Sequence, residues 1–465
     1  MSDAAPTLRP VSAAQLGIWV AQQLQPDSPL YNCGSYLEIA GPIDAELLAE
    51  AVRRAVAETE ALRSSFTEAG DDADGEPGAA AGAGPRLHQV VQAADPNPLQ
   101  IRDLRAEPDP EGAAHRWMDE QLAQVYDLSR TPLSHQTLLV LADDRSFYFH
   151  RYHHAVLDAF GQAVYGSRVA ALYTALATGA EPPATTFTTL DQVVAAETSD
   201  PHSRRTGQAR AYWLDQFADL PDPVALAGQP GSSTHSSLRR IVTLPAELAT
   251  GLTALADRLG VQWPALAIAA TAAFYHRMTG RTDLTFSLPL AGRTGRVSLT
   301  TPSAMVNVLP LRVTVDPQAT FADLAAQVSR SLSDAVRHQR FRGEQLYREL
   351  GLSGGRQARL GPTLNVVGFA NDLTFGALPA VAHPLSTGPV NDLKINFYGS
   401  TATGTGIRVE FDADPTLYDA REIDAHQQRL VRVLEWVVGH PNGVVSGVEV
   451  LGVGELEGLL VGWGG

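Results

Sequence analysis

The same order of elements, a strand followed by an amphipathic helix, recurs in the two halves of this chain of 465 residues. In the first half, residues 35–39 have the pattern of a strand, and Asp44 can cap a helix whose apolar residues share one face. In the second half, residues 238–244 predict a strand and Pro245 opens a helix, which an apolar helix from about Trp263 to Met278 follows. Because 465 residues exceed what one core usually holds, the chain predicts two subdomains of similar layout.

Composition and charge narrow the class of protein. Hydrophobic residues at 44% and charged residues at 18% fit two globular cores. The chain carries 35 basic and 51 acidic side chains, a net charge of −16, which argues against nucleic acid or an anionic membrane surface as its main partner. Cys33 is the single cysteine, so no intrachain disulfide can form. The sequence shows no signal peptide and no apolar run that could span a bilayer, which predicts a cytoplasmic protein.

Stretches without hydrophobic periodicity separate the predicted elements. Residues 69–85 are rich in Gly, Ala and Asp and predict a mobile surface loop, and residues 198–206 form part of the connection between the halves. We therefore predict an N-terminal subdomain of residues 1–195 and a C-terminal subdomain of residues 196–447. The second subdomain closes with an amphipathic helix whose apolar residues run from Ile423 to Val437.

Two adjacent histidines, His153 and His154, precede the carboxylate of Asp158. Residues 146–152 alternate apolar and polar side chains as a half-buried strand does, so the two histidines should face opposite sides of a sheet. A helical pattern over residues 162–176 follows and suits packing on that sheet. An imidazole at a strand end, beside the start of a helix, can transfer protons.

Other interpretations of the two histidines stay open. A histidine at a strand end is more often a satisfied core or surface residue than a reactive one. A zinc site is the third interpretation, but adjacent histidines on a strand diverge, and no Cys, His-x-His or His-Glu-x-x-His partner stands nearby. At the matching place in the second half, residues 283–288 contain no histidine, which predicts a single catalytic centre.

The run from His153 to Asp158 resembles the His-His-x-x-x-Asp-Gly signature of the condensation domains of nonribosomal peptide synthetases, which share their fold with chloramphenicol acetyltransferase. Five further segments are similar to motifs of that family and come in the family's order: Ser12–Trp19, Glu60–Phe66, Leu288–Arg293, Met305–Pro310 and His338–Leu346. The resemblance covers nearly the whole chain. It implies an α+β fold of two chloramphenicol-acetyltransferase-like subdomains that form a V-shaped pseudo-dimer with a central tunnel. It also implies that residues 448–465 are a tether to a downstream adenylation domain.

The resemblance implies a reaction and its partners. The substrates are expected to be acyl groups held as thioesters on the phosphopantetheine arms of donor and acceptor peptidyl carrier proteins. The acceptor amine attacks the donor thioester and a peptide bond forms, while the chain itself, an expected monomer, binds no cofactor and no metal. His154 is our candidate for the group that accepts the amine's proton or orients the amine. The variant Asp158–Gly161 is similar to domains that act early in siderophore-like assembly lines and join L-configured units.

Charged residues around the histidines are given supporting roles. The resemblance suggests an ion pair between Asp158 and Arg293 of the second half, which would hold the histidine loop and join the halves. We favour this anchor over a catalytic acid–base role for Asp158, because it follows the histidine turn. His153 is a second catalytic candidate, although it is expected mainly to pack and fix the loop. Arg63 either neutralises a buried carboxylate or caps the early helices.

Five residues are predicted to contact the substrate. The backbone N–H groups of Ala159, Phe160 and Gly161, at a helix start, can polarise the donor carbonyl, or the glycine can serve close packing alone. Asn307 is expected to bridge backbones near the tunnel. Ser386 lies among Pro and Gly residues that indicate a turn, from which its hydroxyl could reach a substrate. Ala159 replaces the signature's glycine, and its methyl group is expected to restrict the backbone and affect activity or substrate choice.

Some family motifs and some functions stay open. Residues 190–193 and 360–365 match their family motifs poorly and receive no role. One other function is a binding module of this fold that recruits a partner without chemistry. Another is a free-standing acyltransferase that makes an ester or amide on a soluble acceptor. An epimerising relative is disfavoured, because the segment after Asp158 lacks an aromatic Ser-Trp pattern. The sequence does not identify the donor or the acceptor.

Overall fold

The computed structural model describes residues 7–68, 87–93, 97–198, 204–229, 231, 234, 237–293, 295–352, 361–367, 373–399, 406–452 and 455. The loop predicted over residues 69–85 lies outside these residues, as does most of the predicted tether. Contacts divide the chain into two compact units. The first unit comprises Met1–Pro201, Ala291–Val306 and Asn371–Gly388, and the second comprises His202–Leu290, Asn307–Ala370 and Pro389–Gly465.

The predicted boundary near residue 195 lies close to the first change of unit, but the predicted continuous subdomain of residues 196–447 is interrupted twice. The segment Ala291–Val306 belongs to the first unit because its backbone and Arg293 bond to Asp158. The segment Asn371–Gly388 belongs there because its strands extend the first unit's sheet. Both exchanges depend on contacts between residues far apart in the sequence.

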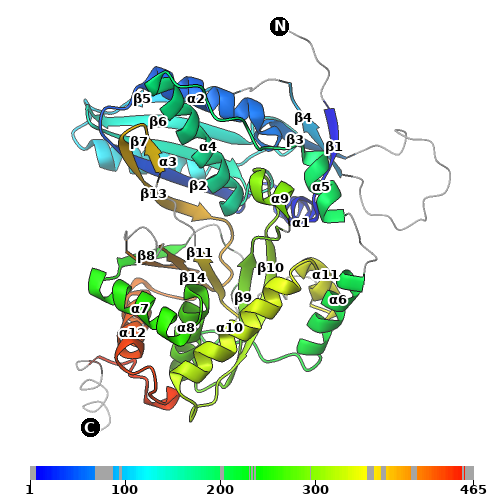
Figure 1. Ribbon diagram of the computed structural model, residues 1–465, viewed down its shortest axis with the longest axis vertical. Helices are drawn as coiled ribbons and strands as arrows, with labels where there is room; N and C mark the ends of the chain where they lie inside the picture. Colours follow the sequence, from blue (N-terminus) through cyan, green and yellow to red (C-terminus); the bar gives the residue numbers. More distant parts are fainter. Residues whose placement is uncertain are drawn as a thin grey trace, which may run out of the picture. The chain divides into compact units, whose positions relative to one another are not determined.

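The first unit contains a six-stranded sheet and a three-stranded sheet (Figure 1). The six-stranded sheet has the order β12-β13-β2-β7-β6-β5, and its strands are β2 (Asn32–Ala40), β5 (Gln100–Asp103), β6 (Ser134–Ala142), β7 (Arg145–His153), β12 (Leu373–Phe375) and β13 (Leu378–Thr387). The three-stranded sheet has the order β1-β4-β3, with β1 (Thr7–Pro10), β3 (Ser64–Glu68) and β4 (Leu87–Val91). The α-helices of this unit are α1 (Ala13–Gln23), α2 (Ala45–Glu58), α3 (Pro110–Leu122), α4 (Ala159–Thr178), α5 (Leu190–Thr198) and α9 (Arg296–Thr300).

Strand β7 is buried on both faces, whereas its sequence predicts a half-buried strand. Tyr148 and Tyr152 share a core cluster with Tyr165 of α4, and Phe147 and Phe149 pack in a second cluster against α3. Helices therefore cover both sides of this part of the sheet. Polar side chains of the strand form hydrogen bonds within this core, as between Nε2 of His150 and Oγ of Ser134 at 2.8 Å.

The second unit contains one six-stranded sheet of order β10-β9-β11-β14-β15-β8. Its strands are β8 (Leu238–Thr243), β9 (Asp283–Leu290), β10 (Asn307–Thr314), β11 (Thr363–Val367), β14 (Leu393–Tyr398) and β15 (Arg408–Ala413). Its helices are α6 (Arg204–Gln216), α7 (Ala246–Leu259), α8 (Trp263–Thr279), α10 (Phe321–Arg337), α11 (Gly343–Glu349) and α12 (Ala420–Gly439). The strands and helices expected at the start of each half are therefore present.

Helix ends and burial follow the predicted patterns. Asp44 caps α2, with Oδ1 accepting the N–H groups of Glu46 at 2.9 Å and Leu47 at 3.0 Å. Helix α8 is buried from Trp263 to His276 because it is apolar on all sides, while α12 buries only one face.

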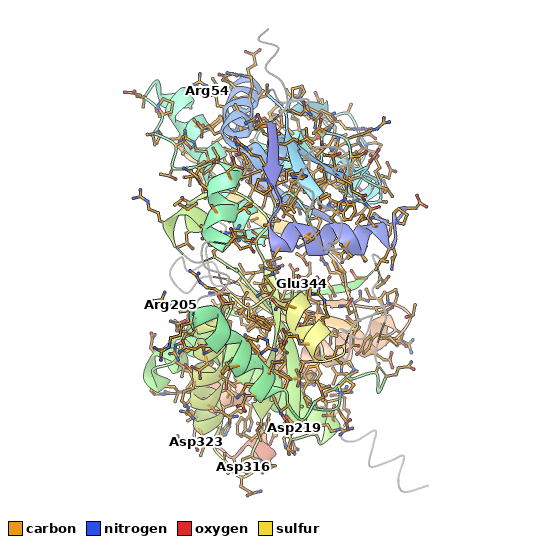
Figure 2. All side chains as sticks on the ribbon, turned by 90° about the vertical axis from the view of Figure 1, so that its right-hand side faces the viewer. Arg54, Arg205, Asp219, Asp316, Asp323 and Glu344 are labelled. Atoms are coloured by element: carbon orange, nitrogen blue, oxygen red, sulfur yellow. The ribbon has the colours of Figure 1, made fainter. Side chains whose placement is uncertain are left out.

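Several acidic side chains of the second unit are exposed to solvent. Figure 2 labels three exposed carboxylates of the second unit, Asp219, Asp316 and Asp323. Among the described residues, no helix is both long and apolar enough to cross a membrane.

Candidate active site

The end of β7 and the start of α4 place the predicted site residues in one turn of the first unit. His153 closes β7, pairing with Asn32 of β2, and its N–H donates to the Leu133 carbonyl at 2.9 Å. The N–H of His154 donates to the Tyr31 carbonyl at 2.8 Å. Hydrogen bonds to two neighbouring segments thus fix the backbone position of each histidine.

His153 is fully buried, with 1% of its surface exposed. Its Nδ1 accepts the N–H of Ala155 at 3.2 Å, and its Nε2 lies 3.2 Å from Oε1 of Gln22. These contacts use both ring nitrogens and place the proton on Nε2. Burial, with the neighbouring His154 as a smaller cause, lowers the pKa of His153 to about 3. The predicted packing role fits this environment, because both nitrogens of the neutral ring already form hydrogen bonds within the protein and none is left for a substrate.

His154 differs because its side chain is half-buried rather than enclosed. A Cβ placed on Gly388 would lie 3.1 Å from Cδ2 of the His154 ring. Gly388 has φ +86°, a conformation that favours glycine, so a side chain at this position would be strained and would press on the imidazole. The end of β13, from a distant part of the sequence, therefore leaves room beside His154.

Asp158 holds the segment Ala291–Val306 onto the start of α4. Its Oδ2 accepts Nη1 of Arg293 at 2.7 Å and the N–H groups of Met305 and Val306 at 2.8 and 3.0 Å. Its Oδ1 accepts the N–H of Gly161 at 2.7 Å and so caps the helix. The predicted ion pair is present, and Arg293 comes from the predicted second half of the sequence, although contacts place both partners in the first unit.

The surroundings of this ion pair keep Asp158 charged. Burial raises the pKa of Asp158, but the charge and hydrogen bond of Arg293, together with the N–H groups of Gly161 and Met305, outweigh it, so the net pKa lies below the usual carboxyl value. Arg293 is also satisfied: it donates to the carbonyls of Ser298 and Ser303 at 3.0 and 2.8 Å. A carboxylate so enclosed is an anchor rather than a proton donor.

The first residues of α4 differ in their surroundings. The N–H of Gly161 is engaged by Asp158, and a Cβ on Gly161 would lie 2.7 Å from the Ser303 carbonyl oxygen. Close packing is therefore the interpretation that the geometry favours for this glycine. The Phe160 ring lies 4.7 Å from the Arg293 guanidinium carbon, and Ala159 is exposed as the first helical residue. Among the described residues only glycines have positive φ, so Ala159 fits without strain.

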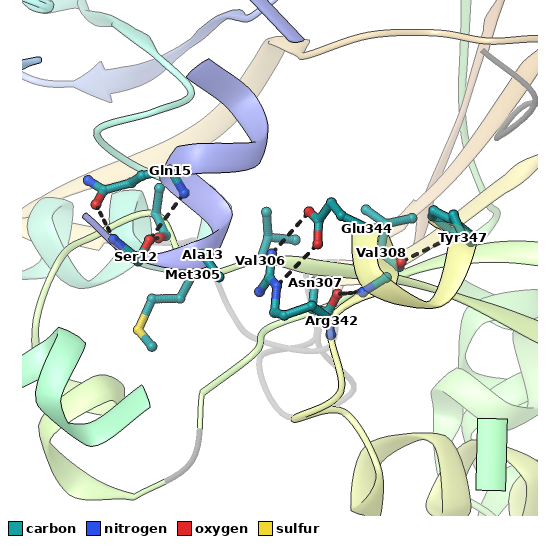
Figure 3. A network of polar contacts seen from close by, with 12 residues as sticks. Ser12, Ala13, Gln15, Met305, Val306, Asn307, Val308, Arg342, Glu344 and Tyr347 are labelled. Atoms are coloured by element: carbon teal, nitrogen blue, oxygen red, sulfur yellow. Dashed lines mark hydrogen bonds and ion pairs between the residues drawn. The ribbon is translucent and has the colours of Figure 1, made fainter. Parts of the chain in front are cut away.

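Asn307 and Ser386 bond to the protein itself. Asn307, in the second unit and labelled in Figure 3, is fully buried. Its Oδ1 accepts the N–H of Gly343 at 2.9 Å. Its Nδ2 donates to the carbonyls of Gln339 and Phe341 at 2.8 and 2.9 Å, so it bridges backbones as predicted. Ser386 lies in strand β13 next to a bulge, not in the expected turn, and its Oγ donates to the Asn32 carbonyl at 2.7 Å.

Arg63 contacts the end of α2. Arg63 donates to the carbonyls of Val56 and Ala57 at 3.3 and 3.2 Å, so it caps the end of α2. The described parts of the chain bring together no group of three His, Cys, Asp or Glu residues suited to a metal.

Two glutamines of α1 contact the histidine turn, although sequence reasoning gave them no role. Gln22 meets His153, and Gln15 donates to the Ala155 carbonyl at 3.0 Å. Gln15 belongs to a family-like motif, whereas no local pattern marks Gln22.

Comparisons with known proteins give a consistent result. The family model described as Condensation domain matches residues 7–460. The isonitrile lipopeptide synthase of Streptomyces coeruleorubidus is 40% identical over 97% of this chain and 30% of its own length. The dimodular nonribosomal peptide synthase of Bacillus subtilis (strain 168) is 36% identical over 97% of the chain and 18% of its own length. The chain thus spans less than a third of these two relatives.

Solved structures show the same fold. The first condensation domain of the calcium-dependent antibiotic synthetase, in complex with a substrate analogue, has a TM-score of 0.87 and 35% identity, covering 97% of this chain and all of that one. A variant of the starter condensation domain of rhizomide synthetase, in complex with C8-CoA, has a TM-score of 0.86 and 32% identity, covering 96% of this chain and 98% of that one.

Proposed function

The chain belongs to the condensation domain family of nonribosomal peptide synthetases, and from this premise we propose that His154 acts on the acceptor amine during peptide-bond formation. Condensation domains catalyse amide-bond formation between substrates held on carrier proteins. They use no cofactor of their own, because the phosphopantetheine arms belong to the partner carrier domains.

One observation carries the assignment to His154. Of the two adjacent histidines, His153 is enclosed and has both ring nitrogens engaged, whereas His154 is half-buried beside a glycine. A ring that must meet a substrate needs this accessibility. The two rings differ in their surroundings, since His153 closes β7 and His154 follows the end of the strand.

Peptide-bond formation requires only a limited contribution from His154. The amine nitrogen bonds to the donor carbonyl carbon, the carbon–sulfur bond breaks, and the donor arm leaves as a thiol. The proton that the amine loses ends on the departing sulfur, and an imidazole can carry or orient it on the way. Since a thioester is already activated, holding the two arms in position supplies much of the rate.

Asp158 and Arg293 serve this reaction as a fixed support. Their ion pair and the N–H groups of Met305 and Val306 hold the residues that follow the histidines. The proposal treats Asp158 as an anchor, because a fully enclosed carboxylate cannot approach a substrate. Asn307 and Ser386 enter as structural residues, since each bonds to backbone groups.

The finer parts of the proposal concern substrates and partners. We propose that one donor and one acceptor carrier protein act with this domain and that both joined units are L-configured. The relatives named enterobactin synthase component F and vanchrobactin synthetase, 31% and 27% identical, favour an assembly line of the siderophore kind. A downstream adenylation domain, a monomeric state, a cytoplasmic location and a tunnel between V-shaped halves stay predictions.

The test is product formation by the purified domain. Intact-protein mass spectrometry would follow amide formation between a carrier-bound aminoacyl or aryl donor and an amino acid that is either carrier-bound or dissolved. The proposal expects product on the carrier and far less with the dissolved acceptor. Equal rates with both acceptors would indicate an acyltransferase for soluble acceptors. Carrier binding without product across a broad donor panel would indicate a recruitment module.

A further inference from the structure

Helix α1 has an inverted distribution of polar and apolar residues. Its buried face carries Gln15, Trp19 and Gln22, with 1%, 8% and 4% of their surfaces exposed. Leu16 and Val20 are instead 37% and 44% exposed. Burying two amides while exposing aliphatic side chains violates the usual pattern of a helix on a core, and such local conflicts are expected at functional positions.

Gln15 and Gln22 lie seven residues apart, or about two turns, so they share one face of α1. Both contact the turn that carries His154. Gln15 donates through Nε2 to the Ala155 carbonyl, on one side of His154. Gln22 meets the ring of His153, on the other side. The helix therefore holds the residues on both sides of His154.

The hydrogen-bond partners of Gln22 fix the orientation of its amide. Nε2 donates to the carbonyls of Gln25 and Ser28 at 2.8 and 3.0 Å. Because both of these partners only accept, Oε1 must be the atom that faces Nε2 of His153 at 3.2 Å. The amide oxygen accepts and does not donate, so this contact requires a proton on Nε2 of His153.

The contact at Nδ1 of His153 also indicates that the ring proton is on Nε2. Nδ1 accepts the N–H of Ala155, which can only donate, so Nδ1 carries no proton. The rings of Tyr31 and Tyr126 face His153 with centroids 6.1 Å away in each case. Burial lowers the pKa of His153 to about 3, so the ring is neutral at physiological pH. Gln22 thus selects one tautomer and one orientation of the ring.

Gln15 is oriented by a similar chain of contacts. Gln89 donates through Nε2 to the Pro10 carbonyl at 2.8 Å, which leaves its Oε1 to accept Nε2 of Gln15 at 2.8 Å. Figure 3 shows the capping box at the start of α1, in which the Ser12 N–H donates to Oε1 of Gln15, at 2.9 Å. Ser12 Oγ also donates to the Ala304 carbonyl at 2.9 Å, within the segment that Asp158 holds. Helix α1 is therefore fixed relative to the histidine turn.

We propose that Gln22 is a positioning residue for peptide-bond formation, which holds His153 as the neutral Nε2–H tautomer and thereby places His154. This inference rests on the proposed function of His154 and adds a residue that never contacts the substrate. The ring of His153 accepts the N–H of Ala155 through Nδ1, so rotation of the ring would break this hydrogen bond. His154 would then lose one of its two fixed neighbours.

The main test compares a substitution at Gln22 with one at its exposed neighbour Gln23. Gln22→Met keeps the size of the side chain but removes the acceptor for Nε2–H of His153, together with the donor for the carbonyls of Gln25 and Ser28. We expect Gln22→Met to lower kcat for amide formation about 10- to 100-fold, with KM for the acceptor carrier within about twofold. Gln23→Met should match the wild type.

A folded Gln22→Met protein with wild-type kcat would overturn the proposal. Turnover by the wild type together with that result refutes the role of Gln22 alone, whereas absent wild-type turnover refutes the proposed function.

A measurement on the wild type keeps the test independent of folding of the variants. Nitrogen-15 NMR of histidine-labelled protein should show His153 as a neutral Nε2–H ring between pH 5 and 8, with His153→Gln used to assign its signals. A ring that titrates in this range, or that carries its proton on Nδ1, would contradict the proposal even if no variant could be prepared.

Discussion

Each unit uses one buried polar side chain to hold a distant backbone segment, Asp158 in the first unit and Asn307 in the second, but the two anchors differ in charge. Asp158 accepts hydrogen bonds from the backbone and forms an ion pair with Arg293. Asn307 makes three hydrogen bonds to backbone groups and is neutral. The charged anchor follows the histidine turn, whereas the neutral anchor opens strand β10.

The difference shows what a charged anchor adds and what it costs. A buried carboxylate needs a buried cation, and removing either one leaves the other uncompensated. In exchange, the carboxylate can accept several N–H groups at once and can cap a helix. The amide of Asn307 needs no countercharge, but it supports fewer groups. Removing Asp158 would therefore leave a buried charge without a partner, whereas removing Asn307 would leave only neutral backbone groups unsatisfied.

The largest effect is expected from breaking the charged anchor. Asp158→Ala should lower the free energy of unfolding by about 3–5 kcal/mol, because it leaves Arg293 buried without a partner. Denaturant unfolding of the variant would measure this loss, with Asp143→Ala, at an exposed position, as the matched control. Stable, fully active Asp158→Ala protein would show that the ion pair supports neither fold nor site.

Acid should weaken the first unit more than the second. Burial lowers the pKa of His135 to about 4 and of His150 and His153 to about 3. In the second unit burial lowers the pKa of His426 to about 4 and also lowers the pKa of the less buried His338. The unfolded chain binds these protons below about pH 6.5 and the folded chain does not, so stability falls as pH falls from about 6.5 towards 4.

Each such proton contributes up to about 1.4 kcal/mol per pH unit. Hydrogen exchange at pH 7 and pH 5, corrected for intrinsic rates, should therefore show a larger loss of protection in the first unit. His150→Gln should reduce that loss. An equal loss of protection in the two units would contradict the account, in which the neutral buried histidines destabilise mainly the first unit at low pH.

The neutral anchor should give a smaller effect. Asn307→Ala removes three hydrogen bonds and leaves the carbonyls of Gln339 and Phe341 unsatisfied, which should cost about 1–3 kcal/mol. Unlike Asp158, Asn307 does not titrate, so the cost should be the same at pH 7 and pH 5. Urea unfolding at both pH values would measure it, and a cost that changed with pH would point to a neighbouring ionisable group.

The smallest effect is expected at the position where the signature has glycine. Ala159 is exposed and begins α4, so Ala159→Gly should change stability by at most about 1 kcal/mol and activity by less than about twofold. Gly161→Ala is the informative partner, because its methyl would press on the Ser303 backbone. A large gain in activity from Ala159→Gly would instead mean that the signature glycine has a role near the substrate.

Local patterns were sufficient for elements that depend on local physics. The apolar face after Asp44 predicts α2, and Pro245 marks the start of α7, because capping and periodicity act over a few residues. The opposite directions expected for the two histidines stay a prediction, because β7 ends at His153. Local patterns do not predict pairing between strands that are far apart in the sequence, such as the antiparallel pairing of β13 with β2.

The parts of the site that were missed depend on such distant contacts. Ser386 was expected in a turn because Pro and Gly surround it, yet strand pairing with β2 overrides that preference. Gly388 and Gln22 carry no local signal, since each matters only through a histidine far away in the sequence. The ion pair of Asp158 was expected from the resemblance, but its confinement to one unit required the structure.

The central claim is that His154, and not its enclosed neighbour, acts on the amine. The most direct test is the single-turnover rate of amide formation on carrier-bound substrates for the wild type, His154→Ala, and His440→Ala, which changes an exposed histidine after α12. We predict a loss of at least about 100-fold for folded His154→Ala and no change for His440→Ala. A folded His154→Ala protein that turns over within about threefold of the wild type would contradict the account.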